Sequence, residues 1–163
     1  MGTTYAVKVI PTGVADDTGP QLVADAADAA IQRVNKYLST YSKTSELSQF
    51  IGLQSTESIA ISQDFSAVVA FGLELFRVSG GAFDVTVGPL INLWGFGPEK
   101  GGAPPTQAQV KEALSRIGSQ YLTLSADEKM LGKSKVDLYV DLSAIAKGYG
   151  VCLLYTSPSP RDS

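Results

Sequence analysis

A glycine-rich segment with a single acid, Ser79–Pro98, is the part of this sequence best suited to bind a ligand. It reads SGGAFDVTVGPLINLWGFGP and contains five glycines, two prolines, Trp94 and one carboxylate, Asp84. Glycine lowers stability inside regular structure, so its repeated use indicates positive φ angles or a ligand lying close to the backbone. Composition alone does not exclude a simpler interpretation. The segment could be a complicated loop between two helices, and Asp84 could be an ordinary turn former.

Two further segments carry side chains with binding chemistry. Ser39–Phe50, STYSKTSELSQF, holds Tyr41, whose ring could stack on a flat ligand or simply be a half-buried loop tyrosine. Residues 141–150, DLSAIAKGYG, carry Asp141 and Lys147 at the start of a predicted helix. A lysine there can serve a phosphate as a point charge, and the helix N-terminus adds N–H groups. The alternatives are a helix N-cap for Asp141 and a solvated charge for Lys147.

The composition excludes several classes of site. The chain has 163 residues, a formal net charge of −3, one cysteine and no histidine. Without histidine, Ser-His-Asp and Cys-His catalysis and histidine-bound metals are excluded, which leaves oxygen-bound cations such as Mg²⁺ or Ca²⁺. No basic cluster occurs, so we expect no nucleic-acid partner. No apolar run approaches the roughly 18 residues of a membrane span, and residues 1–10 do not follow the signal-peptide pattern.

The hydrophobic pattern predicts an α+β fold, because strands and helices are mixed without a strict βαβ order. Period-3.6 patterns, caps and glycine stops predict five helices: Leu22–Leu38, Ser62–Ser79, Thr86–Leu93, Thr106–Gly118 and Asp141–Gly148. A short helical turn after Ser45 is predicted as well. Alternating or extended apolar runs predict five strands: Tyr5–Ile10, Ile59–Ile61, Tyr121–Leu124, Met130–Gly132 and Val136–Val140.

Three quoted segments and a fourth at the start, MGTTY over Met1–Tyr5, occur in the order in which the ApbE family carries similar segments. The chain therefore resembles this family, the FAD:protein FMN transferases, from Met1 to Val151. One departure is Gln49, which stands where the family has arginine. By this resemblance, FAD is contacted by Met1, Tyr41, Ala82, Phe83, Asp84, Asp141 and Lys147, and Mg²⁺ is bound by the backbone carbonyl of Ala144.

The resemblance implies a Mg²⁺-dependent enzyme that cleaves the pyrophosphate of FAD. The FMN half passes to a threonine or serine hydroxyl of an acceptor flavoprotein, a subunit of a membrane redox complex, and AMP is released. It also implies a periplasmic or inner-membrane lipoprotein, attached to the membrane through an N-terminal anchor outside this sequence. The alternatives are an FAD-binding protein without transfer, a Mg²⁺-dependent FAD pyrophosphatase that yields FMN and AMP, and a plain interaction domain.

The last residues depart from the pattern before them. Cys152–Ser163, CLLYTSPSPRDS, resembles the translation of a transposon sequencing adapter, and an ordinary polar tail is the alternative. We therefore interpret residues 1–151 as the N-terminal part of an ApbE-like FAD-binding domain and residues 152–163 as a non-native tail. The family's other Mg²⁺ ligands and its catalytic groups are then expected in a C-terminal half absent from this chain. The fold is expected to be incomplete, the catalytic residues are unknown, and the chain alone is expected to be inactive.

Overall fold

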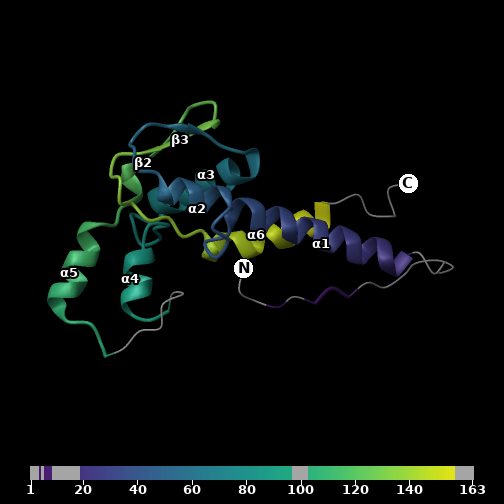
Figure 1. Cartoon of the computed structure of the whole chain (residues 1–163), viewed down its shortest axis with the longest axis horizontal. Helices are drawn as coiled ribbons and strands as arrows, with labels where there is room; N and C mark the ends of the chain where they lie inside the picture. Colours follow the sequence, from purple (N-terminus) through teal and green to yellow (C-terminus); the bar gives the residue numbers. More distant parts are fainter. Residues whose placement is uncertain (1–3, 5, 9–18, 97–102, 157–163) are drawn as a thin grey trace.

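The computed structural model describes residues 4, 6–8, 19–96 and 103–156. Its strands are β1 (Ile59–Ala60), β2 (Leu122–Leu124) and β3 (Met130–Lys133). Its helices are α1 (Gly19–Leu38), α2 (Glu46–Gly52), α3 (Gln63–Val78), α4 (Gly88–Leu93), α5 (Gln107–Ser115), the 3₁₀ turn η1 (Ser119–Tyr121) and α6 (Ser143–Thr156). This mixture of helices with a small sheet confirms the α+β class (Figure 1).

Helices α1 and α6, from opposite ends of the sequence, lie side by side as the long arm of the molecule (Figure 1). Helices α2 and α3 pack against α1, and α3 also contacts α6 and β2. The sheet has the order β1-β3-β2 with antiparallel neighbours, so that Ile59 lies opposite Leu131 and Leu122 opposite Lys133. Helices α4 and α5 pack on each other and project from the body (Figure 1).

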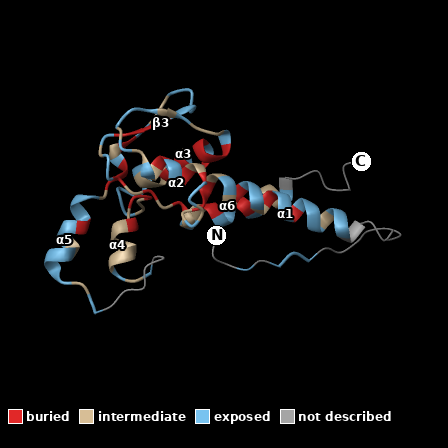
Figure 2. Ribbon diagram, viewed as in Figure 1, coloured by how far each residue is buried: buried red, intermediate tan, exposed pale blue. Residues whose placement is uncertain are grey.

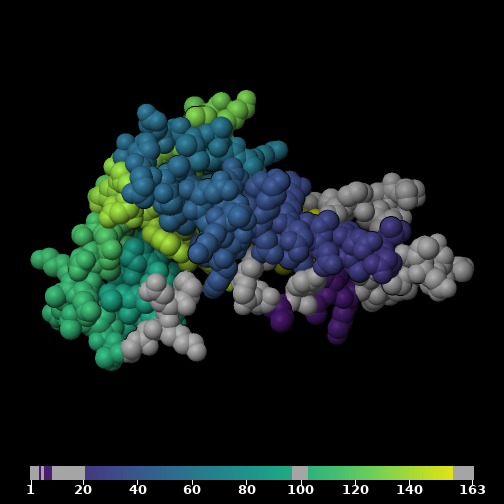
Figure 3. Space-filling model, in the orientation of Figure 1, coloured from purple at the N-terminus to yellow at the C-terminus, as the bar shows by residue number. Residues whose placement is uncertain are grey.

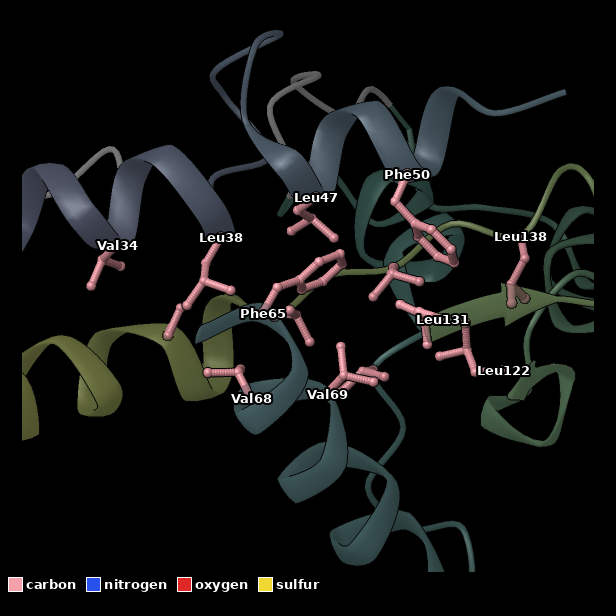
Figure 4. Packing of buried hydrophobic residues seen from close by; sticks show 14 residues of the cluster. Val34, Leu38, Leu47, Phe50, Phe65, Val68, Val69, Leu122, Leu131 and Leu138 are labelled. Carbon is pink, nitrogen blue, oxygen red and sulfur yellow. The ribbon is translucent and has the colours of Figure 1, made fainter. Parts of the chain in front are cut away.

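The hydrophobic core lies where α1, α2, α3 and the sheet meet (Figure 4). Leu38, Phe50, Phe65 and Leu131 come from four different elements and are all buried. Phe50 and Phe65 meet edge to face, with ring centroids 6.0 Å apart, an arrangement that aromatic pairs prefer. Figure 2 shows the buried residues concentrated in this region, whereas much of α5 and the start of α1 are exposed. The core therefore fixes the end of α1 and the first half of α6.

Hydrogen bonds at the helix starts confirm the predicted N-caps. The Ser45 hydroxyl accepts the N–H of Ser48 at the start of α2. The Ser62 hydroxyl accepts the N–H of Phe65 at the start of α3. A short polar side chain in extended conformation satisfies an N–H group that the helix itself leaves unpaired. These local signals are readable in the sequence because they involve near neighbours.

Replacing Thr106 with alanine should lower the free energy of unfolding by about 1 kcal/mol. Thr106 and Gln109 form a capping box: the Gln109 N–H donates to the Thr106 hydroxyl (3.3 Å), and the Thr106 N–H donates to Gln109 Oε1 (2.9 Å). Alanine removes the hydroxyl acceptor. Urea denaturation measures the change, and Thr106→Ser is the control that keeps the cap. Equal midpoints for the alanine variant and the parent would contradict the prediction.

The predicted strand Val136–Val140 is wrong. Every second side chain from Leu138 to Leu142 is buried, so the period-2 pattern is real. The backbone is used differently, however: the Leu138 N–H closes a turn onto the carbonyl of Lys135, and the Asp141 N–H donates to Val85. A strand needs a ladder of bonds to a neighbour, and no ladder forms here. The segment is an extended connection that leads into α6.

The ends of the chain differ from expectation as well. Within the predicted strand Tyr5–Ile10, the described residues Ala6, Val7 and Lys8 have no regular structure. The three-stranded sheet is formed by β1, β3 and β2, and these three residues do not pair with it. The other three positions of the predicted strand lie outside the described residues. At the other end α6 continues past Gly148 through Cys152 to Thr156. Across the described ranges, no helix has both the length and the apolar character needed to span a bilayer.

Candidate functional site

Two predicted site residues from opposite ends of the sequence line one pocket. Tyr41 follows the end of α1, and Lys147 lies in the second turn of α6. They meet because α1 and α6 pack side by side (Figure 1). Both side chains are exposed, so an aromatic face and an ammonium group are accessible together. The rest of the lining is Leu38, Ser39, Thr40, Ser143 and Ala146.

A tight turn after α1 fixes the position of Tyr41. The buried Ser39 hydroxyl accepts the N–H groups of Tyr41 and Ser42, each at 3.2 Å. The carbonyl of Ser39 accepts hydroxyl bonds from Ser45 (2.5 Å) and Ser48 (3.1 Å), which ties this turn to the start of α2. Serine favours such local side-chain-to-backbone bonds over regular structure. The polar segment that reads as a loop in the sequence is therefore a well-bonded platform for Tyr41.

The entrance of α6 is capped from inside the protein. Asp141 Oδ1 accepts the N–H of Ser143 at 2.8 Å, and the carbonyl of Leu142 accepts those of Ile145 and Ala146. Leu142 therefore holds the N-cap position, and Asp141, one residue earlier, accepts the N–H of the first helical residue without being the N-cap itself. Few N–H groups remain for an anion at this helix end, so they contribute less to phosphate binding than the sequence suggested. Lys147 joins no ion pair among the described residues, so its charge is available to an anion at this helix end.

The glycine-rich turn lies next to this helix entrance. The carbonyl of Val85 accepts the N–H of Asp141 at 2.7 Å, which joins the turn to the segment before α6. Ala82 is exposed and Phe83 is half-buried against the core. Gly80 and Gly81 have φ angles of +63° and +85°, so glycine is required there by the backbone. The structure therefore brings two of the quoted segments together by a backbone bond.

A tyrosine, not a ligand, makes the close approach at Gly88. A Cβ atom built there would lie 2.1 Å from Cδ1 of Tyr139. The Tyr139 side chain also hydrogen-bonds that of Thr40, and burial, with a further contribution from Asp141, raises the Tyr139 pKa. Sequence reasoning missed both Thr40 and Tyr139. Thr40 lies inside a quoted segment, whereas Tyr139 gave no signal because its partners are distant in sequence.

A larger cavity, of about 610 Å³, lies between α4 and α5 and contains none of the predicted site residues. Its lining includes Asn92, Gln109, Glu112 and Arg116, and Figure 3 shows these helices, teal and green, as a lobe beside the body. Ligand pockets are mostly apolar with a few convergent polar groups, and this cavity is open and polar. The depression lined by Tyr41 and Lys147 is much smaller, about 10 Å³, so its size does not favour it. We place the candidate site there because two predicted site residues meet at it.

The ApbE family model matches residues 1–155, nearly the whole chain. This chain belongs to the ApbE family. It is 44% identical over 155 residues to the FAD:protein FMN transferase of Haemophilus influenzae, covering 93% of this chain and 44% of that protein. It is 42% identical over 153 residues to the Vibrio cholerae FAD:protein FMN transferase, covering 93% and 44%.

Solved ApbE structures have the same fold. The flavin transferase ApbE from Vibrio cholerae matches with a TM-score of 0.80 at 39% identity, over 90% of this chain and 46% of that one. The Pseudomonas stutzeri flavinyl transferase ApbE, in its apo form, matches with a TM-score of 0.76 at 32% identity, over 86% and 46%. The expected ApbE-like fold is thereby confirmed. The chain spans less than half the length of the relatives it matches.

The magnesium ion that the resemblance implies does not fit the described residues alone. No group of three or more carboxylate or thiol side chains that could hold a metal occurs within the described ranges. Ala144 lies in the first turn of α6, where its carbonyl is positioned to accept a helical hydrogen bond and keeps one lone pair. A single carbonyl does not satisfy the near-octahedral oxygen coordination of Mg²⁺. Met1, the remaining predicted FAD contact, lies outside the described residues.

Proposed function

We propose that this chain supplies the flavin-binding part of an FAD:protein FMN transferase. The observation that carries the proposal is the convergence of Tyr41 and Lys147 on one pocket in a chain of the ApbE family. A tyrosine ring suits the flat isoalloxazine, and an ammonium group suits the pyrophosphate that joins the two halves of FAD. Its relatives' names support transfer to protein over simple FAD binding or hydrolysis.

In the proposed reaction, a threonine or serine hydroxyl oxygen of the acceptor protein attacks the phosphorus of the FMN half. A phosphoester bond forms, the pyrophosphate bond breaks, and AMP leaves with the bridging oxygen. The hydroxyl proton passes to a base. We assign this base to none of the described residues. Phosphoryl transfer depends mostly on positioning and charge stabilisation. Tyr41 would hold the isoalloxazine, and Lys147 would offset negative charge on the pyrophosphate.

The finer parts of the proposal rest on the resemblance. They are a Mg²⁺ requirement, with Ala144 as one ligand, an acceptor subunit of a membrane redox complex, and a periplasmic or inner-membrane lipoprotein. We also propose that this chain alone does not transfer FMN, because the described residues offer a single candidate ligand for the ion. Covalent flavin on an acceptor protein, formed by this chain with FAD and Mg²⁺, would contradict that. AMP release without a labelled acceptor would favour the pyrophosphatase alternative.

Replacing Tyr41 with alanine should weaken FAD binding about two- to tenfold, because ring stacking contributes about 0.5–1.5 kcal/mol and 1.4 kcal/mol is a tenfold change in Kd. Flavin fluorescence is titrated with the chain, with and without Mg²⁺. The matched control is Tyr155→Ala, which removes an exposed tyrosine at the far end of α6. Equal affinities for the parent and Tyr41→Ala would reject stacking at Tyr41. No saturable quenching by the parent would reject flavin binding by this chain alone.

A further inference from the structure

The half-buried Asp84 carboxylate accepts four hydrogen bonds from inside the protein. Its Oδ1 accepts the Thr86 N–H (2.8 Å), the Thr86 hydroxyl (2.6 Å) and the Ser119 hydroxyl (2.6 Å). Its Oδ2 accepts the Ser119 N–H at 3.1 Å. A carboxylate with this many bonds has little capacity left for an outside ligand. The side chain is therefore part of the internal hydrogen-bond network of the fold.

These bonds close a clasp between two distant parts of the chain, and we call Asp84, Thr86, Gly118 and Ser119 the Asp84 clasp. The Thr86 hydroxyl, which donates to Asp84, also accepts the Gly118 N–H at 2.6 Å. Thr86 and Ser119 are buried to 0% and 1% exposure. Gly118 has a φ of +144°, which a residue with a side chain rarely adopts. A buried polar network with every member paired rigidifies the segments that it joins.

The Asp84 clasp encloses the backbone group that holds the entrance of α6. Val85 lies between Asp84 and Thr86 and is itself buried. Its carbonyl accepts the Asp141 N–H at 2.7 Å, and Asp141 Oδ1 in turn accepts the Ser143 N–H at 2.8 Å. Ser143 lines the pocket that also contains Tyr41 and Lys147. A continuous chain of bonds thus runs from Ser119 to the flavin pocket.

We propose that Asp84 is a positioning residue rather than a flavin ligand, and that Thr86 and Ser119 share this role. The Asp84 clasp fixes the Val85 carbonyl, which sets Asp141 and the first turn of α6, and with them Lys147. This inference rests on the proposed function for its consequence in flavin binding. The geometry of the clasp itself is a property of the chain without ligand, so the two can be tested separately.

Amide hydrogen exchange of the chain without ligand tests the clasp directly. In Ser119→Ala and Asp84→Asn we expect the Asp141 N–H to exchange at least about tenfold faster, since its acceptor Val85 is released. The amides of α1 are the internal reference, because a general loss of stability accelerates both. Ser115→Ala, a nearby exposed serine whose hydroxyl bonds within α5, is the matched control. An unchanged Asp141 rate relative to α1 would overturn the proposal.

FAD titration distinguishes positioning from direct contact. If Asp84 positions α6 through the clasp, Asp84→Asn and Ser119→Ala each weaken FAD binding several-fold, and the double variant is no worse than either. Thr86→Ser, which keeps the hydroxyl, should bind like the parent, whereas Thr86→Val should not. Weakening by Asp84→Asn with no effect of Ser119→Ala would show direct contact and reject the inference. A parent that binds no FAD counts against the proposed function, while the exchange result still decides the clasp.

Discussion

Replacing Asp64 with alanine is expected to lower the free energy of unfolding by about 3 kcal/mol. The buried Asp64 carboxylate joins three helices: it accepts Nε and Nη2 of Arg33 at 2.6 and 2.8 Å and the hydroxyl of Tyr149 at 2.5 Å. Removal leaves the half-buried Tyr149 hydroxyl without its acceptor and frees Arg33, whose side chain is about half exposed. The loss therefore falls at the low end of the range for a buried ion pair.

Urea denaturation measures this loss, and the exposed pair of Glu74 and Arg77 supplies the control. These residues make a similar bidentate contact on the surface of α3. Surface ion pairs contribute little because water screens them and ordering the side chains costs entropy. Glu74→Ala should therefore leave the midpoint unchanged. An Asp64→Ala midpoint equal to that of Glu74→Ala would contradict a structural role for this network.

The same network makes stability depend on pH. Burial raises the pKa of Asp64, but hydrogen bonds from Arg33 and Tyr149 outweigh it and hold the pKa below its ordinary value. A carboxylate whose pKa is lower in the folded state stabilises the folded protein at pH values above its unfolded-state pKa. This stabilisation is lost as the pH falls through the folded-state pKa. Burial and the bond to Asp64 raise the pKa of Tyr149 to about 12. The stabilisation that Tyr149 contributes is therefore complete below its unfolded-state pKa, near 10. It is lost as the pH rises through the folded-state pKa of about 12.

Unfolding titrations across pH separate these two contributions. Asp64→Ala should flatten both the acid and the alkaline loss of stability, since it removes the shared acceptor. Tyr149→Phe should flatten the alkaline loss and keep most of the acid one, because the Arg33 bonds to Asp64 remain. Identical pH profiles for Tyr149→Phe and the parent above pH 10 would show that the phenol does not titrate as the structure indicates.

Replacing Gly88 with alanine should destabilise the protein by about 3 kcal/mol, the upper end of the range for overpacking. The new Cβ would lie 2.1 and 2.4 Å from ring carbons of Tyr139, so the ring must move. That movement also breaks the bond between Tyr139 and Thr40, which lines the pocket of Tyr41 and Lys147. Thermal or urea unfolding measures the stability, and FAD titration shows whether the pocket is disturbed.

Gly148→Ala is the matched control for this glycine, with an opposite expected sign. Gly148 lies inside α6 and a Cβ there meets nothing within 4 Å. Alanine is favoured over glycine in a helix interior by about 0.5–1 kcal/mol, so this variant should be slightly more stable. Tyr139→Ala in the Gly88→Ala background should recover part of the loss, because it removes the clash. No recovery would mean that the contact between Gly88 and Tyr139 is not the cause.

The local structure of this protein could be predicted from its sequence. The stripe of apolar residues marks α1, and Ser45, Ser62 and Thr106 mark helix starts, because a cap bonds to an N–H only a few residues away. The repeated glycines of Ser79–Pro98 indicated positive φ angles or a ligand close to the backbone, and Gly80 and Gly81 have positive φ. Family membership followed from the same quoted segments, and the match over residues 1–155 confirms it.

The connection before α6 shows where such reasoning ends. The apolar pattern of Val136–Val140 indicated a strand, but a strand exists only where a second segment supplies a hydrogen-bonded ladder. The sequence carries the pattern of side chains and not the identity of the neighbour. Gly88 is similar: the sequence showed only that its segment is rich in glycine, and the ring of Tyr139 that leaves no room for a Cβ atom is seen only in the structure.

By itself the sequence determined the family, the α+β class, the helix caps and the candidate residues Tyr41, Asp84, Asp141 and Lys147. The tertiary structure alone decided which of them meet. It brought Tyr41 and Lys147 to one pocket, bonded Asp141 to the N–H of the first residue of α6, and bonded Asp84 to Thr86 and Ser119. The physical reason is the sequence separation of the interacting residues. Caps and turns depend on hydrogen bonds between near neighbours. The site and the residues that position it depend on packing between distant segments, which only the whole core brings together.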